Sequence, residues 1–344
     1  MSHALTVRGL VKRFGNHLAV DDISFEVPRG VVYGILGPNG AGKSTTLRMI
    51  NDIFAPDAGE IMVLDGLRPG HAAAQHIGYL PEERGLYPRM KVADMIAFIG
   101  ELRGLSRGEA RRRTAQWLDR LGLAQWATNK VQDLSKGMQQ KVQFATALIH
   151  EPELVILDEP WSGLDPINAE VLRQVVDEIR SAGRTVLFST HQMEQAEKLV
   201  DHICIIARGR KLLDGRLADL QRREAADGII SLGFASPGFA PDPGGDRSRA
   251  AADAVLADRA LVAERRPPRA RPQADGADCE VKLADGATAQ QLLAALVAAG
   301  VELQRFEVVV PTLHQIFVDR VGASAAVAER RPGAPDSPDT GAVA

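Results

Sequence analysis

The sequence predicts an α/β protein with a largely parallel β-sheet, followed by a small α+β domain. Three observations support this fold class. Apolar, strand-like runs alternate with helical patterns as far as about residue 225. A glycine-rich stretch, GPNGAGKST (37–45), joins one of these runs to a helix. The composition changes near residue 235, and a second alternation of strands and helices begins near residue 279.

The first elements are β-strands. Residues 4–35 contain the runs LTVRGL, LAVDDISFEV and VVYGIL, and Pro28-Arg29-Gly30 marks a turn between the last two. We expect an N-terminal antiparallel β part that leads into a buried parallel strand. After the glycine-rich stretch, STTLRMIND reads as a helix, and EIMVLDG and HIGYLP read as strands.

A helical insertion is expected at about residues 84–150. Ser106 and Glu109 form a capping-box signature at the start of RGEARRRTAQWLDRLG. The arginines of this helix raise the alternative of an anionic partner. We favour a solvated helix face, because Glu109 and Asp119 are interspersed among them.

Strands and helices then alternate again. ELVILD and RTVLFST read as buried strands, NAEVLRQVVDEIRSAG as a long amphipathic helix and MEQAEKLV as a short one. HICIIARGRKLLDG reads as two strands around a tight turn. These elements complete a first domain at residues 1–225.

The second domain is expected at residues 226–322. It contains DGIISLGF, CEVKL, ATAQQLLAALVAAG, VELQRFEVVV and PTLHQIFVDRVG, which suffice for a small α+β domain. Residues 236–278 are rich in Pro, Gly, Ala, Asp and Arg and are expected to form a disordered linker. The arginines at 265–271 fit a plain linker better than a contact with acidic lipid. Residues 323–344 are expected to be a disordered tail.

Bulk composition limits the functional class. The chain has 344 residues, of which 45% are hydrophobic and 25% charged, as in ordinary globular proteins. The formal net charge of −3 argues against a nucleic-acid-binding protein. The two cysteines, Cys204 and Cys279, form no metal-ligand or disulfide framework, which fits a reducing cytosol. No run resembles a signal peptide or membrane span, so any membrane part is expected from another chain.

The glycine-rich stretch predicts a phosphate-binding loop. Gly37, Gly40 and Gly42 allow turns that a Cβ atom would block, so that successive N–H groups point at an anion near the helix N-terminus. Lys43 supplies a full charge for the β and γ phosphates, and the Ser44 hydroxyl is placed to ligate Mg²⁺. The spacing therefore predicts binding of a nucleoside triphosphate with Mg²⁺.

The stretch LVILDEP (154–160) supplies two carboxylates at a strand end. Asp158 is expected beside the metal ion, often through a water molecule. Glu159 points to the other side of the strand end, where it is expected to polarise a water molecule for attack on the γ phosphate.

A second helix start, LSKGMQQK (134–141), offers an N-cap at Ser135 and exposed N–H groups at Gly137. Together with SGLDP (162–166) and STH (189–191), the ordered set of motifs resembles the ATP-binding cassette family, the ATPase subunits of ABC transporters. The resemblance covers residues 1 to about 225 and implies the fold of that family's P-loop NTPase core.

In that family two cassettes dimerise head to tail, and each ATP lies between one chain's phosphate loop and the other chain's LSKGMQQK-type signature. The resemblance implies that Glu159 and His191 are catalytic, with His191 contacting the γ phosphate. It implies Mg²⁺ ligands at Ser44, Glu82 and Asp158. The implied ATP-binding residues are Phe14, Gly37, Pro38, Asn39, Gly40, Ala41, Gly42, Lys43, Ser44, Thr45, Ser135, Gly137 and Asp165.

Two departures from the family pattern stand out. Glu82 replaces a glutamine; its carboxylate can ligate Mg²⁺ but, when ionised, cannot donate a hydrogen bond to water. Lys136 and Met138 replace a glycine and a glutamine of the signature, while Gly137 is retained. These changes predict altered turnover without fixing its direction.

The stretches PEERGLYPRMKV (81–92) and PTLHQIFVDRVG resemble export-type cassettes with a small C-terminal accessory domain. The implied function is an ATP-hydrolysing subunit that drives transport, with efflux as the expected direction. Its expected partners are separate membrane permeases and a second copy of itself or a homologous cassette, at the cytoplasmic side of the membrane. Two alternatives stay open: a cassette ATPase that acts on DNA or ribosomes, and a nucleotide-gated module whose hydrolysis is vestigial.

Overall fold

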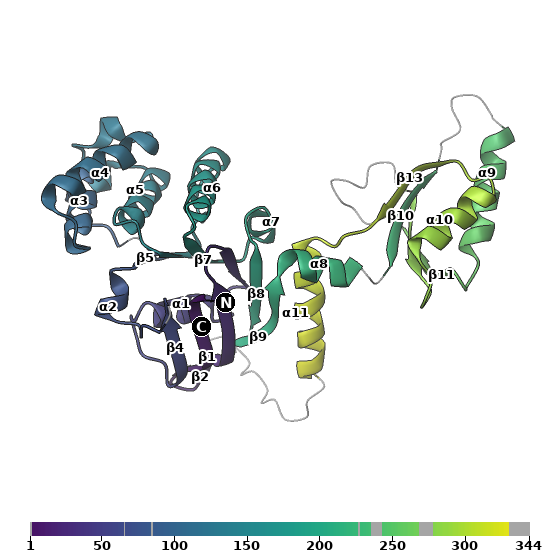
Figure 1. Cartoon of the computed structure of the whole chain (residues 1–344), viewed down its shortest axis with the longest axis horizontal. Coiled ribbons are helices and arrows are strands. Elements are labelled where there is room, and N and C mark those ends of the chain that lie inside the picture. Colours follow the sequence, from purple (N-terminus) through teal and green to yellow (C-terminus); the bar gives the residue numbers. More distant parts are fainter. Residues whose placement is uncertain are drawn as a thin grey trace, which may run out of the picture. The chain divides into compact units, whose positions relative to one another are not determined.

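The structure is a computed structural model that describes residues 2–64, 66–83, 85–225, 228–234, 243–267 and 278–329. The chain divides into two compact units, which are described separately below (Figure 1). The first unit contains the described residues up to Leu217 and those from Phe317 onward, and the second is Ala218–Ile316.

A six-stranded sheet forms the centre of the first unit. The strand order is β5-β6-β7-β3-β8-β9; the first five strands are parallel, and β9 pairs antiparallel with β8. Strands β3, β6 and β7 are buried along their whole length, which explains their nearly continuous apolar sequences. The predicted α/β core is confirmed. The strands are β3 (Val32–Leu36), β5 (Ile77–Leu80), β6 (Leu154–Asp158), β7 (Thr185–Thr190), β8 (His202–Ala207) and β9 (Arg210–Arg216).

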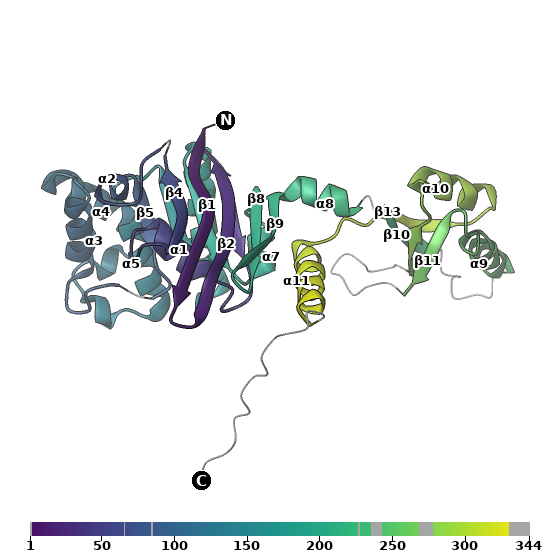
Figure 2. The same ribbon diagram turned by 90° about the horizontal axis from the view of Figure 1, so that it is seen from below.

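The predicted N-terminal antiparallel part is also confirmed. It is a three-stranded sheet in the order β2-β1-β4, formed by β1 (His3–Phe14), β2 (His17–Pro28) and β4 (Ala58–Val63). Figure 2 shows the long strands β1 and β2 side by side. Alternate residues of β1 and β2 are buried in a core cluster that they share with β3, β6 and α1 (Lys43–Ile50).

Further helices of the first unit follow the strands. They are α2 (His71–Ala74), α6 (Pro166–Ser181), which follows β6, and α7 (Met193–Glu197), which follows β7. The chain reaches the second unit through α8 (Leu217–Ala225) and returns through α11 (Leu313–Glu329). Because the parallel strands end at one edge of the sheet, the loops after β3, β6 and β7 meet there and build the site described below.

Between β5 and β6 lie the helices α3 (Val92–Leu102), α4 (Arg107–Arg120) and α5 (Lys136–Leu148), with two 3₁₀ turns at Ala124–Trp126 and Val131–Asp133 (Figure 1). Ser106 caps α4 by accepting a hydrogen bond from the Glu109 amide at 3.3 Å. The Glu109 carboxylate does not complete a capping box; it accepts hydrogen bonds from Arg112 and Arg113 instead. Two of the arginines are thus paired with a glutamate of the same helix, which is compatible with a solvated face.

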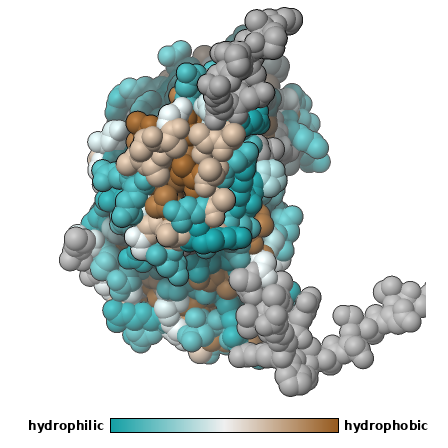
Figure 3. Space-filling model, turned by 90° about the vertical axis from the view of Figure 1, so that its right-hand side faces the viewer, coloured by the Kyte–Doolittle hydropathy of each residue, from teal (hydrophilic) through white to brown (hydrophobic). Residues whose placement is uncertain are grey.

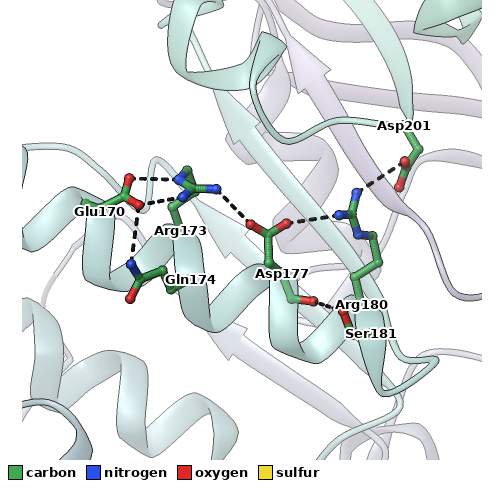
Figure 4. Close-up of polar contacts among 7 residues, drawn as sticks. All are labelled: Glu170, Arg173, Gln174, Asp177, Arg180, Ser181 and Asp201. Carbon is green, nitrogen blue, oxygen red and sulfur yellow. Dashed lines mark hydrogen bonds and ion pairs between the residues drawn. The ribbon is translucent and has the colours of Figure 1, made fainter.

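Helix α6 carries a chain of ion pairs on its surface (Figure 4). Arg173 donates to Glu170 at 2.8 Å and to Asp177 at 2.8 Å, and Arg180 donates to the other Asp177 oxygen at 3.1 Å. Arg180 also reaches Asp201 at 3.4 Å, just before β8. This series of ion pairs therefore connects α6 to the beginning of β8.

Asp201 holds two further segments. Its Oδ2 accepts a hydrogen bond from the Val32 amide at 2.9 Å, and its main-chain oxygen accepts one from the Leu217 amide at 2.9 Å. A single residue therefore joins α6, the start of β3 and the start of α8.

The second unit is a four-stranded antiparallel sheet with two helices. The strand order is β11-β12-β10-β13, and the chain order is β-α-β-β-α-β, which is the ferredoxin-like arrangement. One face of the sheet packs with both helices around buried residues such as Leu232, Leu256 and Leu296. The elements are β10 (Ile229–Phe234), α9 (Pro243–Leu256), β11 (Val262–Arg266), β12 (Cys279–Leu283), α10 (Ala289–Ala298) and β13 (Leu303–Val308).

Two expectations of disorder are wrong in part. The segment 236–278 contains α9 and β11. Its apolar residues are spaced so that they can be buried together: Ala252 and Leu256 share one helix face, and Val262 is 2% exposed. The segment 323–344 begins within α11, whose end is rich in alanine, the best helix former. The remaining parts of both expectations, at 236–242, 268–277 and 330–344, lie outside the described residues.

Among the described residues, no helix combines the length and hydrophobicity that crossing a membrane requires. Hydrophobic residues do gather on the face of the second unit that Figure 3 presents. Helix α10 has no charged residue, and its Val297 is 62% exposed.

Candidate functional site

The phosphate loop joins β3 to α1 and depends on its glycines. A Cβ atom at Gly37 would lie 2.2 Å from the Ile206 main-chain oxygen, and one at Gly42 would lie 2.4 Å from that of Ala19. Gly40 and Gly42 also have positive φ angles, of +76° and +100°. The backbone therefore follows a path that side chains would block, as the sequence predicted.

The start of α1 is open to an anion. Gly42 is its N-cap and provides no side-chain hydrogen bond, so the first amides are available to a ligand. Lys43 follows at once and is 5% exposed. Its Nζ donates to the main-chain oxygens of Gly37 at 2.9 Å and Pro38 at 3.2 Å, which hold the charge over the loop. A concave backbone, a helix N-terminus and a buried cation together fit a polyphosphate.

Asp158, at the end of β6, is fully buried beside the loop. Its Oδ1 accepts hydrogen bonds from Ser44 at 3.0 Å and Ser189 at 2.5 Å. Its Oδ2 is buried and has no hydrogen-bond partner in the described part of the chain. Burial raises the pKa of Asp158. A buried carboxylate oxygen without a donor, next to a serine hydroxyl, fits a hard divalent cation such as Mg²⁺.

Glu159 brings together three other side chains. It is 6% exposed and has a φ angle of 48°, which is rare for a residue with a side chain. Its Oε1 lies 2.9 Å from Nδ1 of His191 and 3.5 Å from Nζ of Lys43, and its Oε2 accepts from the Thr190 hydroxyl at 3.1 Å. Sequence reasoning predicted Glu159, His191 and Lys43, and the structure brings these three into one cluster.

Ser135 and Gly137 lie at the start of α5. Ser135 is the N-cap and accepts a hydrogen bond from the Met138 amide at 3.3 Å. A Cβ atom at Gly137 would lie 3.7 Å from Leu164 and from Asn168, so this helix start adjoins the loop that contains Asp165. Asp165 caps α6 through the Asn168 amide at 2.9 Å, and these hydrogen bonds lower its pKa. No hydrogen bond or ion pair in the described residues connects this group to the Lys43–Glu159 cluster.

Two other predicted residues are exposed. Phe14, at the end of β1, is 48% exposed, and Glu82 is exposed in the loop after β5. Gln143 of α5 fastens that loop by donating to the main-chain oxygens of Pro81 at 3.0 Å and Glu83 at 3.2 Å.

Sequence reasoning gave no role to three supporting residues of the site: Ser189, Thr190 and Gln143. The first two were visible as polar residues at the end of the buried run TVLFST, where the carboxyl ends of parallel strands meet. Gln143 gave no signal, because a glutamine on an amphipathic helix is ordinarily exposed.

Comparisons with known proteins show the family of the chain. Residues 20–162 match the family described as ABC transporter, and residues 257–321 match the family described as ATP-binding protein DrrA1-3-like, C-terminal domain. An uncharacterized ABC transporter ATP-binding protein of Bacillus subtilis, YhaQ, is 36% identical over 319 residues, which are 93% of this chain and 99% of that protein.

Two relatives have more specific names. The linearmycin resistance ATP-binding protein LnrL of Bacillus subtilis is 38% identical over 66% of this chain and 74% of its own length. The Nod factor export ATP-binding protein I of Ralstonia nicotianae is 37% identical over 66% of this chain and 72% of its own.

A solved ATP-binding subunit of an ABC transporter is 32% identical and matches with a TM-score of 0.60, over 64% of this chain and 93% of that one. The match of both family models in order, and of one relative over nearly its whole length, decides the assignment. The chain belongs to the ATP-binding proteins of ABC transporters, and it is an ATPase subunit of that family.

Proposed function

We propose that this chain hydrolyses Mg²⁺-ATP with Glu159 as the general base and thereby drives export through separate membrane permeases. The observation that carries the proposal is the contact of the buried Glu159 with His191 and Lys43 at the carboxyl edge of the sheet. The relatives named for export and resistance support efflux as the direction. We assign the chain to the cytoplasmic side of the membrane, as a peripheral subunit.

In the proposed reaction the loop residues and Lys43 bind the β and γ phosphates. Ser44 and Asp158, with Glu82, would hold Mg²⁺, which would neutralise charge on the phosphate oxygens when bound. Glu159 accepts a proton from the attacking water molecule. Nδ1 of His191 lies 2.9 Å from the Glu159 carboxylate, which leaves Nε2 of the ring for the proposed contact with the γ phosphate.

The proposal includes a second copy of the chain, or a homologous cassette. Ser135, Gly137 and Asp165 lie together at the start of α5 and α6, yet within the described residues no hydrogen bond or ion pair joins them to Lys43. A head-to-tail dimer explains this arrangement, because it brings the signature of one copy to the phosphate loop of the other.

The permease is proposed to dock near Glu82, beside α3. Aromatic and aliphatic side chains are exposed there: Tyr87 is 54% exposed, Phe98 38% and Leu102 65%. Tyr87 and Phe98 contact each other edge to face at 6.2 Å. Next to Leu102, Arg103 lines a pocket with Ile53 and Tyr79, among others. Exposed apolar groups beside a mainly apolar pocket suit a helical segment of a membrane subunit.

The test compares Glu159→Gln with Glu101→Gln, an exposed glutamate of α3 that has no part in the proposed site. Glu159→Gln should bind ATP normally and lose turnover by about 100-fold or more, because general-base catalysis contributes about that much. Glu101→Gln should match the wild type in both. Light scattering in Mg²⁺-ATP should find the Glu159→Gln protein as a dimer.

Wild-type turnover in Glu159→Gln would reject Glu159 as the base. A monomer at saturating Mg²⁺-ATP would reject the shared site. A wild-type protein that binds ATP tightly without detectable turnover would favour the nucleotide-gated module instead.

A further inference from the structure

The exposed ring of Phe14 is held by two side chains that no motif predicted. The ring of Phe54 lies 5.5 Å from it, centroid to centroid, at an interplanar angle of 87°. The Nζ atom of Lys12 lies 5.6 Å from each ring centroid, at cation–π distance. Phe54 in turn packs against the hydrophobic core of the first unit. The core therefore sets the position of Phe54, and Phe54 that of Phe14.

Lys12 is itself fixed in place. Its Nζ donates to the main-chain oxygen of Ala55 at 2.8 Å and to Oδ1 of Asp57 at 2.9 Å. The second oxygen of Asp57 accepts from the Arg13 amide at 2.7 Å, and the Asp57 amide donates to the Val11 oxygen at 2.9 Å. These bonds tie the end of β1 to the segment before β4. The Lys12 side chain is consequently only 14% exposed.

The cluster adjoins the phosphate loop. Phe14 pairs with His17 across the turn between β1 and β2, and two residues later the Ala19 oxygen lies 2.4 Å from the ideal Cβ position of Gly42. The exposed ring therefore stands a few residues from the place where the triphosphate is proposed to bind.

We propose that Lys12, Phe54 and Asp57 are positioning residues that hold the Phe14 ring ready to stack on the base of the nucleotide. The proposal rests on the stacking role of Phe14 in the proposed function. A ring that keeps 48% of its surface exposed while its neighbours are pinned is available to a planar ligand. Pinning it before binding removes an entropic cost that a free side chain would pay on ordering.

The charge of Lys12 is expected to interact with the Phe14 ring and not with the phosphates. Its ammonium group already has a carboxylate and a carbonyl oxygen as acceptors. The cluster is thus expected to act on the base half of the ligand, which makes it separable from the loop by experiment.

The experiment compares binding of ATP with binding of inorganic tripolyphosphate, which has no base. Lys12→Met removes the charge and keeps the chain length, and it should weaken ATP binding about three- to fivefold. Phe54→Leu should weaken it about fivefold. Tripolyphosphate affinity should stay at the wild-type value in both, and KM for ATP should rise at constant kcat. Lys12→Arg keeps the positive charge and should therefore bind ATP with the wild-type affinity. Lys130→Met, at an exposed lysine, is the control.

An equal loss of ATP and tripolyphosphate affinity would overturn the proposal, because it would locate the effect at the phosphates. Unchanged ATP affinity in both variants would overturn it too, and Asp57→Asn repeats the test if Phe54→Leu folds poorly. Phe14→Ala tests the stacking role of Phe14 separately from the positioning role of Lys12, Phe54 and Asp57. If that variant binds ATP normally, the stacking role fails; if it alone weakens ATP binding, the stacking role stands and only the positioning cluster fails.

Discussion

Alanine substitutions at the three glycines of the phosphate loop separate two physical costs. Gly40 has a φ angle of +76° and nothing within 4 Å of its ideal Cβ position, so alanine there pays only for the left-handed backbone. Gly37 does not have a positive φ, but its Cβ would lie 2.2 Å from a main-chain oxygen. Gly42 combines a φ of +100° with a contact of 2.4 Å.

The magnitudes follow from these geometries. A left-handed alanine costs about 1–2 kcal/mol, of which about 0.4–1 kcal/mol is offset by the stiffer unfolded chain, so Gly40→Ala should lose about 1 kcal/mol. Overpacking costs about 1–3 kcal/mol, and a backbone neighbour cannot move aside, so Gly37→Ala should lose about 3 kcal/mol. Gly42→Ala carries both costs and should lose roughly 4 kcal/mol.

Urea unfolding followed by tryptophan fluorescence measures these losses. All three tryptophans, Trp117, Trp126 and Trp161, belong to the first unit, and Trp161 is buried against Phe188 at 4.9 Å. Gly108→Ala is the control, because that glycine lies in α4 with open space around it and a normal φ; alanine there should be neutral or stabilising. A Gly40→Ala protein that is as unstable as Gly42→Ala would refute the reasoning.

Two further predictions concern charge. Burial, with the nearby Arg103 charge, lowers the pKa of His150 to about 4, so between about pH 6.5 and 4 the unfolded chain binds a proton that the folded one does not. As the pH is lowered through that window, the free energy of unfolding of the first unit should therefore fall by up to about 3 kcal/mol. His150→Gln should flatten this dependence in urea titrations, and equal slopes would contradict it. Asp158→Asn keeps an oxygen for Ser44 and Ser189 but loses the negative charge, so calorimetry should find that Mg²⁺ no longer strengthens ATP binding. An unchanged Mg²⁺ effect would remove Asp158 from the metal site.

Much of the first unit was predictable because its signals are local. The buried strands are continuous apolar runs, and the spacing of the loop glycines is visible in the sequence, although the contacts that require Gly37 and Gly42 come from Ile206 and Ala19. The cluster of Glu159 and His191 was predictable only through the family resemblance. Nothing in the residues alone says that the ends of β6 and β7 are neighbours in the sheet.

The rest depended on tertiary contacts. The composition of residues 236–278 is typical of disorder, but Ala252 and Leu256 fold because β10 and β12 offer an apolar face to bury them. The role of Lys12 was hidden for the same reason. Its partners at 54–57 lie more than 40 residues away in sequence, and only the pairing of β1 with β4 brings them near.

We expect substitutions at Asp201 to be tolerated less well than substitutions at the outer ion pairs of α6. The outer pairs of α6, such as Arg173 with Glu170, lie at the solvent-accessible surface, where an ion pair contributes little to stability. Substitutions can therefore remove these ion pairs one at a time with little effect on stability. Asp201 differs from those residues, because a substitution there would remove both the side-chain bond to Arg180 of α6 and the one to the Val32 amide at the start of β3, while its main-chain bond to Leu217 would remain.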